Sequence, residues 1–445
     1  MPTFPVILTS LLLGAQLSLA SPTVSRLRRW DISSYCNAPH VNVSHYEPPE
    51  EGEELLHLSI MMRHHKRTPS TLVPDELEIN NGVPWDCSGV NQFTYDGGGG
   101  RLSNAVTIPP GHPFKEQIWT GSCEVGQLTP GGFQDSKTHG KDLWEVYHAQ
   151  LGFLQAVQPS EISVRTTHVD RTKHVASGVL AGMDPSSAKR KWPAHAQPEL
   201  ESNIDSLVPN YKCPRADSLL SAAQAAPFWQ DVLKRNSALK KRLDTVLGTE
   251  NSTISLSSFV LYQDILTART CNDHPLPCNA AGDCVSEEDA EEIFELGNFE
   301  LDYLFHLAEN ATEYVQLTFG VFFSELANAL EAPEHRLALY VAHDLSVIRL
   351  AAGLEIFPLR WPRLGSEIVL EIWRDGNNDR FVRVLYDGET VDSLKWTPFY
   401  EFLDLLRRQV PDHIVERCAE ASLSVQVSGK VKGTEWSQEP FTFQY

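Results

Sequence analysis

Two short segments of this 445-residue chain combine residue types suited to chemistry on an anion. The first, Arg63-His64-His65-Lys66-Arg67, directly follows the apolar run 55–62. Guanidinium groups bind phosphate oxygens bidentately and stay charged at any working pH, while a neutral imidazole can act as a nucleophile. The second segment, His343-Asp344, follows the apolar run 337–342 and adds a carboxyl group. Together the two segments predict phosphoryl transfer through a phosphohistidine.

For the two segments to act together, the fold must bring them close to each other. The runs 55–62 and 337–342 are short and apolar, which predicts buried strands, and residues 162–166 are predicted to form a further strand. Helices are predicted from Thr129 to about Leu154, where threonine is the N-cap and a proline follows it, and from Thr172 to Met183. Strands that alternate with helices predict an α/β fold with a mostly parallel central sheet flanked by helices. In such sheets ligands bind at the carboxyl ends of strands, so we expect the two segments to converge there.

The order of the elements predicts two regions of different character. Further strands are predicted at 368–373 and 381–386. Residues 21–199 and 336–445 are therefore assigned to the α/β core. Residues 200–335 have mainly helical patterns, which predicts a smaller, mainly helical cap domain inserted into that core.

The charge of the chain limits its partners. A formal net charge of -21 argues against nucleic acid and against anionic membrane surfaces. An anionic substrate is also repelled at long range. A phosphate site must therefore rely on local arginines, which act well within a Debye length of roughly 8–10 Å.

Several features predict passage through the secretory pathway. Residues 1–20 are expected to be a cleaved signal peptide, because they are almost all apolar or small. Eight cysteines fit up to four disulfides in an oxidising compartment, and glycosylation sequons begin at Asn42, Asn251 and Asn310. Secretion is predicted, with the secretory-pathway lumen or the vacuole as alternatives. No later segment is long and apolar enough to span a bilayer, so no stable membrane insertion is expected.

Metal binding is the competing interpretation of some of these residues. The spacings among Cys271, Cys278 and Cys284 match no common zinc site. His64 and His65 are adjacent, and adjacent side chains of an extended segment point to opposite faces, so they chelate one ion poorly. We therefore predict no metal and no other cofactor.

Five motifs occur in the order found in one known family. They are Arg63-His64-x-x-Arg67-x-Pro69, Gly126-Gln127-Leu128-Thr129, Val164-Arg165-Thr166-Thr167-x-Val169-Asp170-Arg171-Thr172, His343-Asp344 and Pro362-x-x-Gly365-Ser366-Glu367-Ile368-x-x-Glu371-x-Trp373. In residue types and order they resemble the histidine acid phosphatase family, which includes acid phosphatases and phytases. The resemblance covers about residues 55 to 390. The region after Pro69, with Trp85-Asp86-Cys87, resembles 2-phosphoxylose phosphatase-like members and their fungal relatives more than typical phytases.

The resemblance implies a phosphoglycerate mutase-like fold and a role for each matched residue. His64 would be the nucleophile, and Asp344 would protonate the leaving alcohol. The phosphoryl oxygens would be bound by Arg63, Arg67, Arg171 and His343. A carboxyl group that donates a proton works best at acid pH, so an acid optimum is expected.

One position departs from the family pattern. His65 stands where the family has glycine, and it would narrow the pocket, point outward or add a hydrogen bond to substrate. Lys66 would contact a second anionic group or remain an exposed charge. Both are candidates for lining the pocket, whereas Arg165 is expected to form a structural ion pair.

The sequence therefore predicts a secreted, metal-independent acid phosphatase that hydrolyses phosphate monoesters. The alternative is a non-catalytic secreted phosphate- or glycan-binding relative of the same fold, with His65 as its basis. Asp344 favours the enzyme, because binding alone needs no acid. A mutase is a third interpretation, which secretion disfavours. Phytate, phosphosugars, phosphorylated glycans and phosphoproteins all stay open as substrates, and so does the oligomeric state.

Overall fold

The computed structural model describes most of the chain between Ile32 and Glu420. The described residues are 32–49, 52–80, 82–88, 90, 92–94, 101–103, 109–186, 192, 194–195, 204–208, 211–250 and 258–420. The predicted signal peptide, residues 1–20, and the sequon at Asn251 lie outside them.

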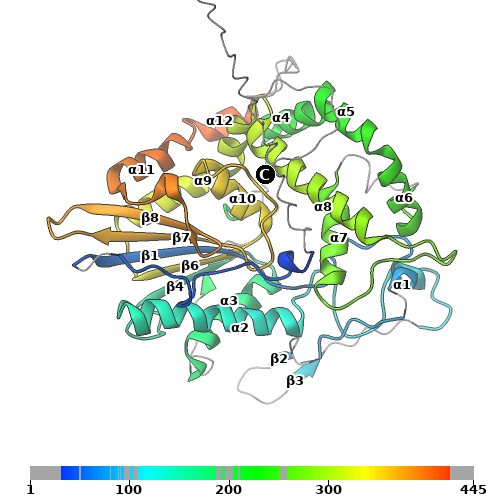
Figure 1. Ribbon diagram of the computed structural model, residues 1–445, viewed down its shortest axis with the longest axis horizontal. Coiled ribbons are helices and arrows are strands. Elements are labelled where there is room, and N and C mark those ends of the chain that lie inside the picture. The colour runs from blue at the N-terminus through cyan, green and yellow to red at the C-terminus, as the bar shows by residue number, and fades with distance from the viewer. Residues whose placement is uncertain are drawn as a thin grey trace, which may run out of the picture. The chain divides into compact units, whose positions relative to one another are not determined.

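An eight-stranded mixed sheet is the centre of the fold, with the order β10-β8-β7-β1-β6-β4-β5 and β9 paired to β8 (Figure 1). Its strands are β1 (Glu54–Arg63), β4 (Ile162–Thr166), β5 (Ala194–His195), β6 (Leu337–Ala342), β7 (Glu367–Arg374), β8 (Arg380–Tyr386), β9 (Glu389–Thr390) and β10 (Thr397–Pro398). A separate pair comprises β2 (Gln92–Thr94) and β3 (Arg101–Ser103). The α/β class expected from the sequence is confirmed.

The sheet is mixed rather than mostly parallel. β6 runs parallel to β1 and β4, and β4 to β5, whereas β7 is antiparallel to both β1 and β8. Only residues 375–379 separate β7 from β8. A parallel connection needs a crossover of a dozen or more residues, so these two strands must form a hairpin. Both strands were predicted, but their directions were wrong.

Helices cover both faces of this sheet. Those in the part of the chain that the structure describes are α1 (Glu76–Ile79), α2 (Pro130–Trp144), α3 (Asp170–Met183), α4 (Pro214–Ala225), α5 (Pro227–Arg235), α6 (Ser237–Leu247), α7 (Val260–Thr270), α8 (Glu287–Asp302), α9 (Ala311–Glu331), α10 (Asp344–Gly353), α11 (Phe399–Arg408) and α12 (Ile414–Ala419). Figure 1 shows α2 and α3 against one face and α9, α10 and α11 against the other. The predicted N-cap is present, because Thr129 Oγ1 accepts a hydrogen bond from Gly132 N at 3.2 Å. A π-helical turn, Glu145–Gln150, extends α2 and matches the predicted long helix.

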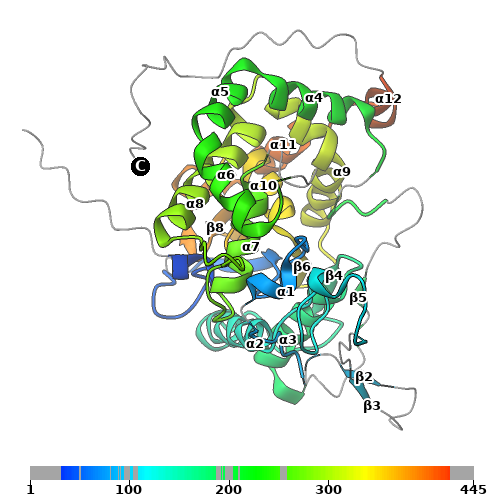
Figure 2. The same ribbon diagram turned by 90° about the vertical axis from the view of Figure 1, so that its right-hand side faces the viewer.

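Most of the described residues between Pro214 and Glu331 are helical and form α4 to α9, whereas residues 271–286 form a loop between α7 and α8. Figure 2 shows α4, α5, α6 and α8 on the side of the fold away from α2 and α3. Aromatic side chains pack these helices together, since the Trp229 ring stacks on Tyr303 at 5.3 Å between ring centroids. This helical character agrees with the predicted cap region, and the division into core and cap domains stays a prediction.

The eight cysteines form four disulfides, as their even number predicted. The pairs are Cys36–Cys271, Cys87–Cys123, Cys213–Cys418 and Cys278–Cys284. The three cysteines weighed as zinc ligands are thus all engaged with sulfur. Among the described residues, no cluster of histidine, cysteine or acidic side chains has the arrangement of a metal site.

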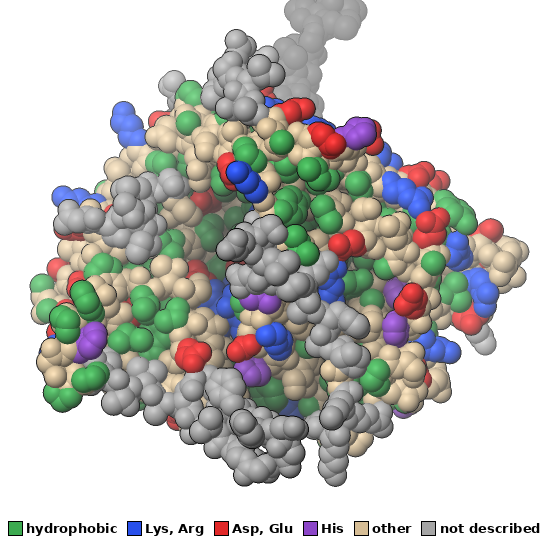
Figure 3. Space-filling model, turned by 180° about the vertical axis from the view of Figure 1, so that it is seen from behind, with side chains coloured by type: hydrophobic (Ala, Val, Ile, Leu, Met, Phe, Trp, Pro, Cys, Tyr) green, Lys and Arg blue, Asp and Glu red, His purple; other side chains and the backbone are tan. Residues whose placement is uncertain are grey.

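The described surface shows little segregation of charge on the face in Figure 3. There, acidic and basic side chains are interspersed with hydrophobic ones. Within the described residues no helix combines the length and the apolar character needed to cross a membrane.

Candidate active site

The carboxyl ends of three neighbouring strands carry the matched site residues. β1 pairs with β6 so that Arg63 lies opposite Ala342, and β6 pairs with β4 so that Val341 lies opposite Thr166. Because these strands run parallel, the segments that follow them emerge at one edge of the sheet. The residues that emerge there are His64 after β1, His343 after β6 and Arg171 in the first turn of α3. The structure therefore brings the two distant segments together.

A cavity of about 450 Å³ opens at this edge. Its wall includes five of the residues singled out in the sequence: His64, Arg67, Arg171, His343 and Asp344. A cavity of this size is within the range of small-molecule sites.

His64 is held as a neutral imidazole. Its Nδ1 lies 2.9 Å from the backbone oxygen of His65, which places the hydrogen on Nδ1 and leaves Nε2 with its lone pair. Arg67 Nε donates weakly to that Nε2 at 3.4 Å. Burial lowers the pKa of His64 well below its usual range, and the charge of Arg171 lowers it further. The ring therefore stays a nucleophile even at acid pH.

Two arginines of the cavity wall offer charge to an anion. Arg67 Nη1 donates to Thr68 O at 2.9 Å, and its Nη2 pairs with Asp264 Oδ1 at 2.6 Å. Arg171 Nη2 lies 3.4 Å from His343 Nδ1. Burial lowers the pKa of Arg171 to about 10, which leaves it charged at neutral and acid pH. These guanidinium groups can neutralise phosphoryl oxygens around His64.

Arg63 lies behind the cavity wall rather than in it. It is 1% exposed, and its Nη2 pairs with Asp344 Oδ2 at 2.9 Å. Nη1 donates to Pro362 O at 2.6 Å, and the guanidinium stacks 4.6 Å above the ring of Trp361. In this geometry the side chain contacts the carboxyl group directly, so its charge acts first on Asp344.

Asp344 is surrounded by donors that favour its ionised form. Oδ2 accepts from Trp361 Nε1 at 3.0 Å, and Oδ1 accepts from the backbone N of Leu345 at 2.8 Å. Burial raises the pKa of Asp344, but the charges of Arg63 and Arg67 outweigh it and bring the pKa down to about 2. A phosphate dianion bound to Arg67 in the cavity acts in the opposite direction. Substrate binding must therefore raise this pKa if Asp344 is to donate a proton.

Replacing Trp361 tests this coupling. Trp361→Phe keeps a ring against Arg63 but removes the donor to Asp344. Loss of a hydrogen bond to a charged group costs about 1.5–3 kcal/mol, so we expect the pKa of Asp344 to rise by roughly one unit or more. A general acid works only while protonated, so the alkaline limb of the pH dependence of kcat/KM should move to higher pH.

The measurement is a pH profile with an alkyl phosphate, whose leaving group needs protonation. Trp144→Phe is the matched control, because Trp144 stacks on His148 at 4.1 Å, outside the cavity wall. An unchanged alkaline limb in Trp361→Phe would mean that this hydrogen bond does not set the pKa of the acid.

His65 points away from the cavity, as expected for the neighbour of His64 in an extended segment. Its side chain is fully buried, with Nδ1 3.0 Å from Ser136 Oγ and Nε2 3.4 Å from His139 Nδ1. His139 Nε2 in turn lies 2.9 Å from Glu367 Oε2. Gly365 leaves room for this ring, because a Cβ there would lie 2.7 Å from His65 Nε2. His65 thus fixes the backbone that orients the nucleophile instead of lining the pocket.

Lys66 is also absent from the cavity wall, and its Nζ pairs with Asp135 at 3.1 Å. The proposal that these two neighbours of the nucleophile line the pocket is therefore not supported by the geometry. Arg165 forms the expected structural ion pair, since its Nη1 lies 2.6 Å from Glu325 Oε2 and its Nη2 lies 2.6 Å from Ser206 Oγ.

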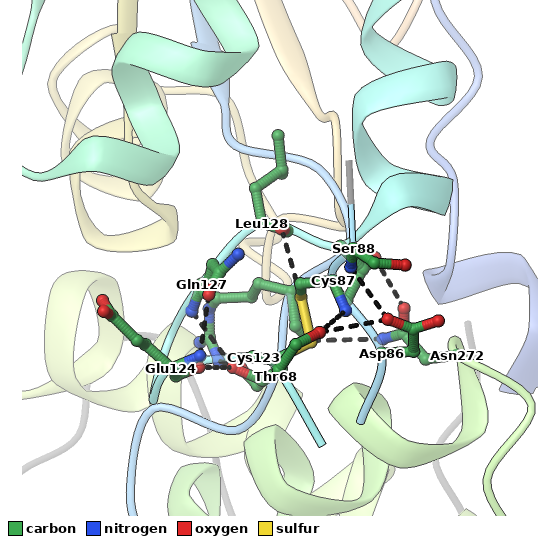
Figure 4. Close-up of a disulfide and its surroundings, with 12 residues drawn as sticks. Thr68, Asp86, Cys87, Ser88, Cys123, Glu124, Gln127, Leu128 and Asn272 are labelled. Atoms are coloured by element: carbon green, nitrogen blue, oxygen red, sulfur yellow. Dashed lines mark hydrogen bonds between the residues drawn. A yellow bond between two sulfur atoms is a disulfide. The ribbon is translucent and has the colours of Figure 1, made fainter. Parts of the chain in front are cut away.

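The backbone after Arg67 is fixed from two sides. Thr68 Oγ1 donates to Glu124 O at 2.7 Å and accepts from Gln127 N at 3.0 Å, beside the Cys87–Cys123 disulfide (Figure 4). Asn272 Nδ2 donates to Arg67 O at 3.1 Å. The Gly126-Gln127-Leu128-Thr129 motif therefore supports the backbone that follows Arg67.

Three residues of the site were given no role from the sequence: Asp264, Trp361 and Thr167. Asp264 lies in a helix remote in sequence, and no motif surrounds it. Trp361 immediately precedes the fifth motif, and Thr167, whose Oγ1 lies 3.0 Å from His343 Nε2, is part of the third. Trp361 and Thr167 could have been identified from the sequence, because each lies in or next to a motif that is close to the end of a predicted strand.

Comparison with known proteins identifies the family to which this chain belongs. Residues 54–387 match the model of the histidine phosphatase superfamily (branch 2). Counting factor 60 of Dictyostelium discoideum is 25% identical over 385 residues, which cover 80% of this chain and 84% of that protein. Human lysosomal acid phosphatase is 25% identical over 343 residues, covering 71% and 77%.

The fold also matches solved structures. A Hafnia alvei phytase in complex with myo-inositol hexakis sulphate superposes with a TM-score of 0.57 over 82% of this chain and 99% of that one. The sequence identity of this pair is 14%, so the likeness concerns the fold alone. Because the family model spans most of the chain, the chain belongs to branch 2 of the histidine phosphatase superfamily and is a histidine acid phosphatase.

Proposed function

We propose that this protein is a secreted, metal-independent acid phosphatase that hydrolyses phosphate monoesters through a phosphohistidine on His64, with Asp344 as proton donor. One observation carries the proposal. The neutral Nε2 of His64, two arginines and a carboxyl group line the same cavity at the carboxyl ends of β1, β6 and β4. Phosphoryl transfer needs positioning and charge neutralisation more than covalent assistance, and arginines supply both.

The reaction follows from these positions. Nε2 of His64 attacks phosphorus, the phosphorus–oxygen ester bond breaks, and the leaving oxygen takes the proton of Asp344. The ionised Asp344 then accepts a proton from water, whose oxygen attacks the phosphohistidine and restores the free imidazole. Inorganic phosphate is released, and Asp344 regains its proton, so that each step balances.

The pH optimum follows from the same two groups. The low pKa of His64 keeps the nucleophile neutral well into the acid range. Asp344 must be protonated, and its pKa of about 2 rises only through the bound phosphate. Activity is therefore expected to fall as the pH rises above the raised pKa of Asp344, which places the optimum on the acid side.

A simple assay tests the proposal. Phosphate release from p-nitrophenyl phosphate between about pH 3 and 8 should peak at acid pH and persist in excess EDTA, because arginines provide the charge that a metal would otherwise supply. Activity that disappears in EDTA and returns with a divalent ion would contradict a metal-independent mechanism. A folded protein without activity at any of these pH values would contradict the enzyme itself.

The alternative of a non-catalytic binding protein now has less support. Its basis was His65, and that side chain packs on Ser136 and His139 outside the cavity. Secretion is supported by the predicted signal peptide and by four disulfides. Of the predicted glycosylation sites, Asn42 is partly exposed in a turn and Asn310 is the N-cap of α9.

A further inference from the structure

Arg349 is a buried cation of the cavity wall whose protein contacts are all uncharged. It lines the cavity, and the residue is only 7% exposed. Its Nε donates to Thr318 Oγ1 at 3.1 Å, and its Nη1 donates to Leu345 O at 3.0 Å. Among the described residues no carboxylate forms an ion pair with it. A buried charge without a counter-charge costs free energy, which an anionic ligand would offset.

The guanidinium group of Arg349 has donors that these two contacts leave unused. A guanidinium carries five N–H groups, and the bonds to Thr318 and Leu345 engage two of them. The others are on Nη1 and Nη2, which together can bind two oxygens of one carboxylate or phosphate. The guanidinium carbon lies 5.2 Å from the centroid of the Phe305 ring, and this stacking holds the group in place. The wall therefore presents an oriented pair of donors to an oxyanion.

Glu325 does not neutralise this cation. Burial raises the pKa of Tyr211 to about 12, and the charges of Arg349 and Glu325 shift it in opposite directions, so both groups act on this hydroxyl. Oε2 of Glu325, however, accepts from Arg165 Nη1 at 2.6 Å and from Ser206 Oγ at 2.6 Å. This carboxylate therefore pairs with a different arginine.

Arg349 also differs from the arginines that surround the nucleophile. Burial lowers the pKa of His64, and the arginines whose charges lower it further are, in order, Arg171, Arg67 and Arg63. Arg349 is not among them, so its charge acts less strongly at the nucleophile than theirs. It is therefore placed to contact a part of the substrate other than the transferred phosphate.

The position of Arg349 in α10 indicates that this part is the leaving group. The helix begins at Asp344, the proposed proton donor, and Arg349 lies in its second turn. Long helical side chains point back toward the N-terminus of their helix, as the bond from Nη1 to Leu345 O does here. The leaving oxygen must contact Asp344 to receive its proton, so the alcohol part of a substrate extends past the same end of α10. A round cavity of about 450 Å³ is roughly 10 Å across, which suits a spacer of a few carbon atoms.

We infer that Arg349 binds a second anionic group, a carboxylate or a phosphate, on the alcohol part of the substrate, so that the enzyme prefers phosphate monoesters that carry one. The inference rests on the proposed phosphatase function and narrows its substrate class. Arg349 lies outside the five motifs that the chain shares with the family, so family membership alone does not imply this contact.

Matched substrates with a four-carbon chain test the inference. Butyl phosphate ends in a methyl group, 4-phosphonooxybutanoate has a carboxylate in its place, and 4-phosphonooxybutanamide is the uncharged counterpart. At about pH 6, where the carboxylate is ionised, the wild type should prefer the carboxylate over butyl phosphate by about tenfold in kcat/KM, as a hydrogen bond to a charged group predicts. The amide should behave like butyl phosphate. 1,4-Butanediol bisphosphate should also be preferred, compared per phosphate.

Substitutions of Arg349 show whether this residue causes the preference. Arg349→Met keeps an extended side chain against Phe305 but removes the charge and the donors, so the preference for the carboxylate should fall to about one. Arg349→Lys keeps a point charge without the paired donors and should retain part of the preference. Arg336→Met is the matched control, because Arg336 also stacks on a phenylalanine ring, 5.4 Å from the centroid of Phe153, and donates to Phe153 O at 3.0 Å, outside the cavity wall. It should keep the wild-type preference.

Two results would overturn the inference at once: equal kcat/KM values of the wild type on butyl phosphate and on both anionic substrates, or a preference that Arg349→Met retains. An equal loss on butyl phosphate and on the carboxylate in both Arg349 variants would also overturn it, because Arg349 would then act on the transferred phosphate or on the fold. A preference for only one of the two anionic substrates supports the inference and identifies the group that is bound.

Each overturning result leaves the phosphatase function intact, because the wild type still hydrolyses butyl phosphate. Absence of hydrolysis of every monoester by the wild type would instead contradict the proposed function.

Discussion

His64→Ala should abolish phosphate release. No other described imidazole in the cavity wall has its Nε2 beside Arg67 with the hydrogen fixed on Nδ1, so water would have to attack the ester directly. Removal of a catalytic nucleophile costs on the order of 10⁴-fold or more in kcat. The measurement is turnover of p-nitrophenyl phosphate, together with trapping of labelled enzyme by an alkaline quench. A phosphohistidine is labile to acid and stable to base, which distinguishes it from a phosphoserine or an acyl phosphate.

His112→Ala is the matched control for this experiment, because His112 is exposed to solvent and lies outside the motifs and the cavity wall. It should retain both activity and label. Label that persists in His64→Ala would assign the phosphorylated residue elsewhere, and His343 would be the first candidate because its ring centroid lies 5.4 Å from that of His64.

Asp344→Asn should slow hydrolysis in a manner that depends on the leaving group. The amide cannot give a proton to the leaving oxygen, so kcat on hexyl phosphate is expected to fall by about 10²- to 10⁴-fold. p-Nitrophenolate is a stable anion that needs little protonation, and its release should be affected far less. The contrast between the two substrates is the readout. A general collapse of the site would slow both alike.

Inhibition by inorganic phosphate provides a second test of Asp344→Asn. The substitution removes a negative charge that pairs with Arg63, so the phosphate dianion should bind more tightly to the variant than to the wild type. Weaker binding of phosphate would show that Asp344 mainly organises the arginines, and its assignment as the acid would fail.

Much of the site could be predicted because its catalytic residues directly follow strands that can be recognised in the sequence. β1 and β6 are largely apolar, buried strands, and each leads directly into polar residues that a buried strand end would otherwise not tolerate. The parallel register then places His64 and His343 side by side without further information. The hairpin of β7 and β8 could also have been predicted, because the short connection 375–379 excludes a crossover.

The rest depends on contacts that leave no mark in local sequence. Asp264 pairs with Arg67 although the two residues are 197 positions apart in the chain. The helix that carries Asp264 has no motif that would indicate this contact. Arg63 was expected to hold phosphate, since a motif gives the order of residues but not which way a guanidinium turns. Its stacking on Trp361 is a tertiary contact.

The packing of His65 against Gly365 has a consequence for the evolution of this protein. A methyl group at position 365 would collide with the imidazole, and Gly365 also has a positive φ of 76° that other residues rarely adopt. While His65 occupies this space, a side chain at position 365 cannot fit without displacing its ring, which Ser136 and His139 hold in place. These four positions should vary together among descendants of the chain. Replacement of His65 by glycine alone would leave a buried void beside the nucleophile.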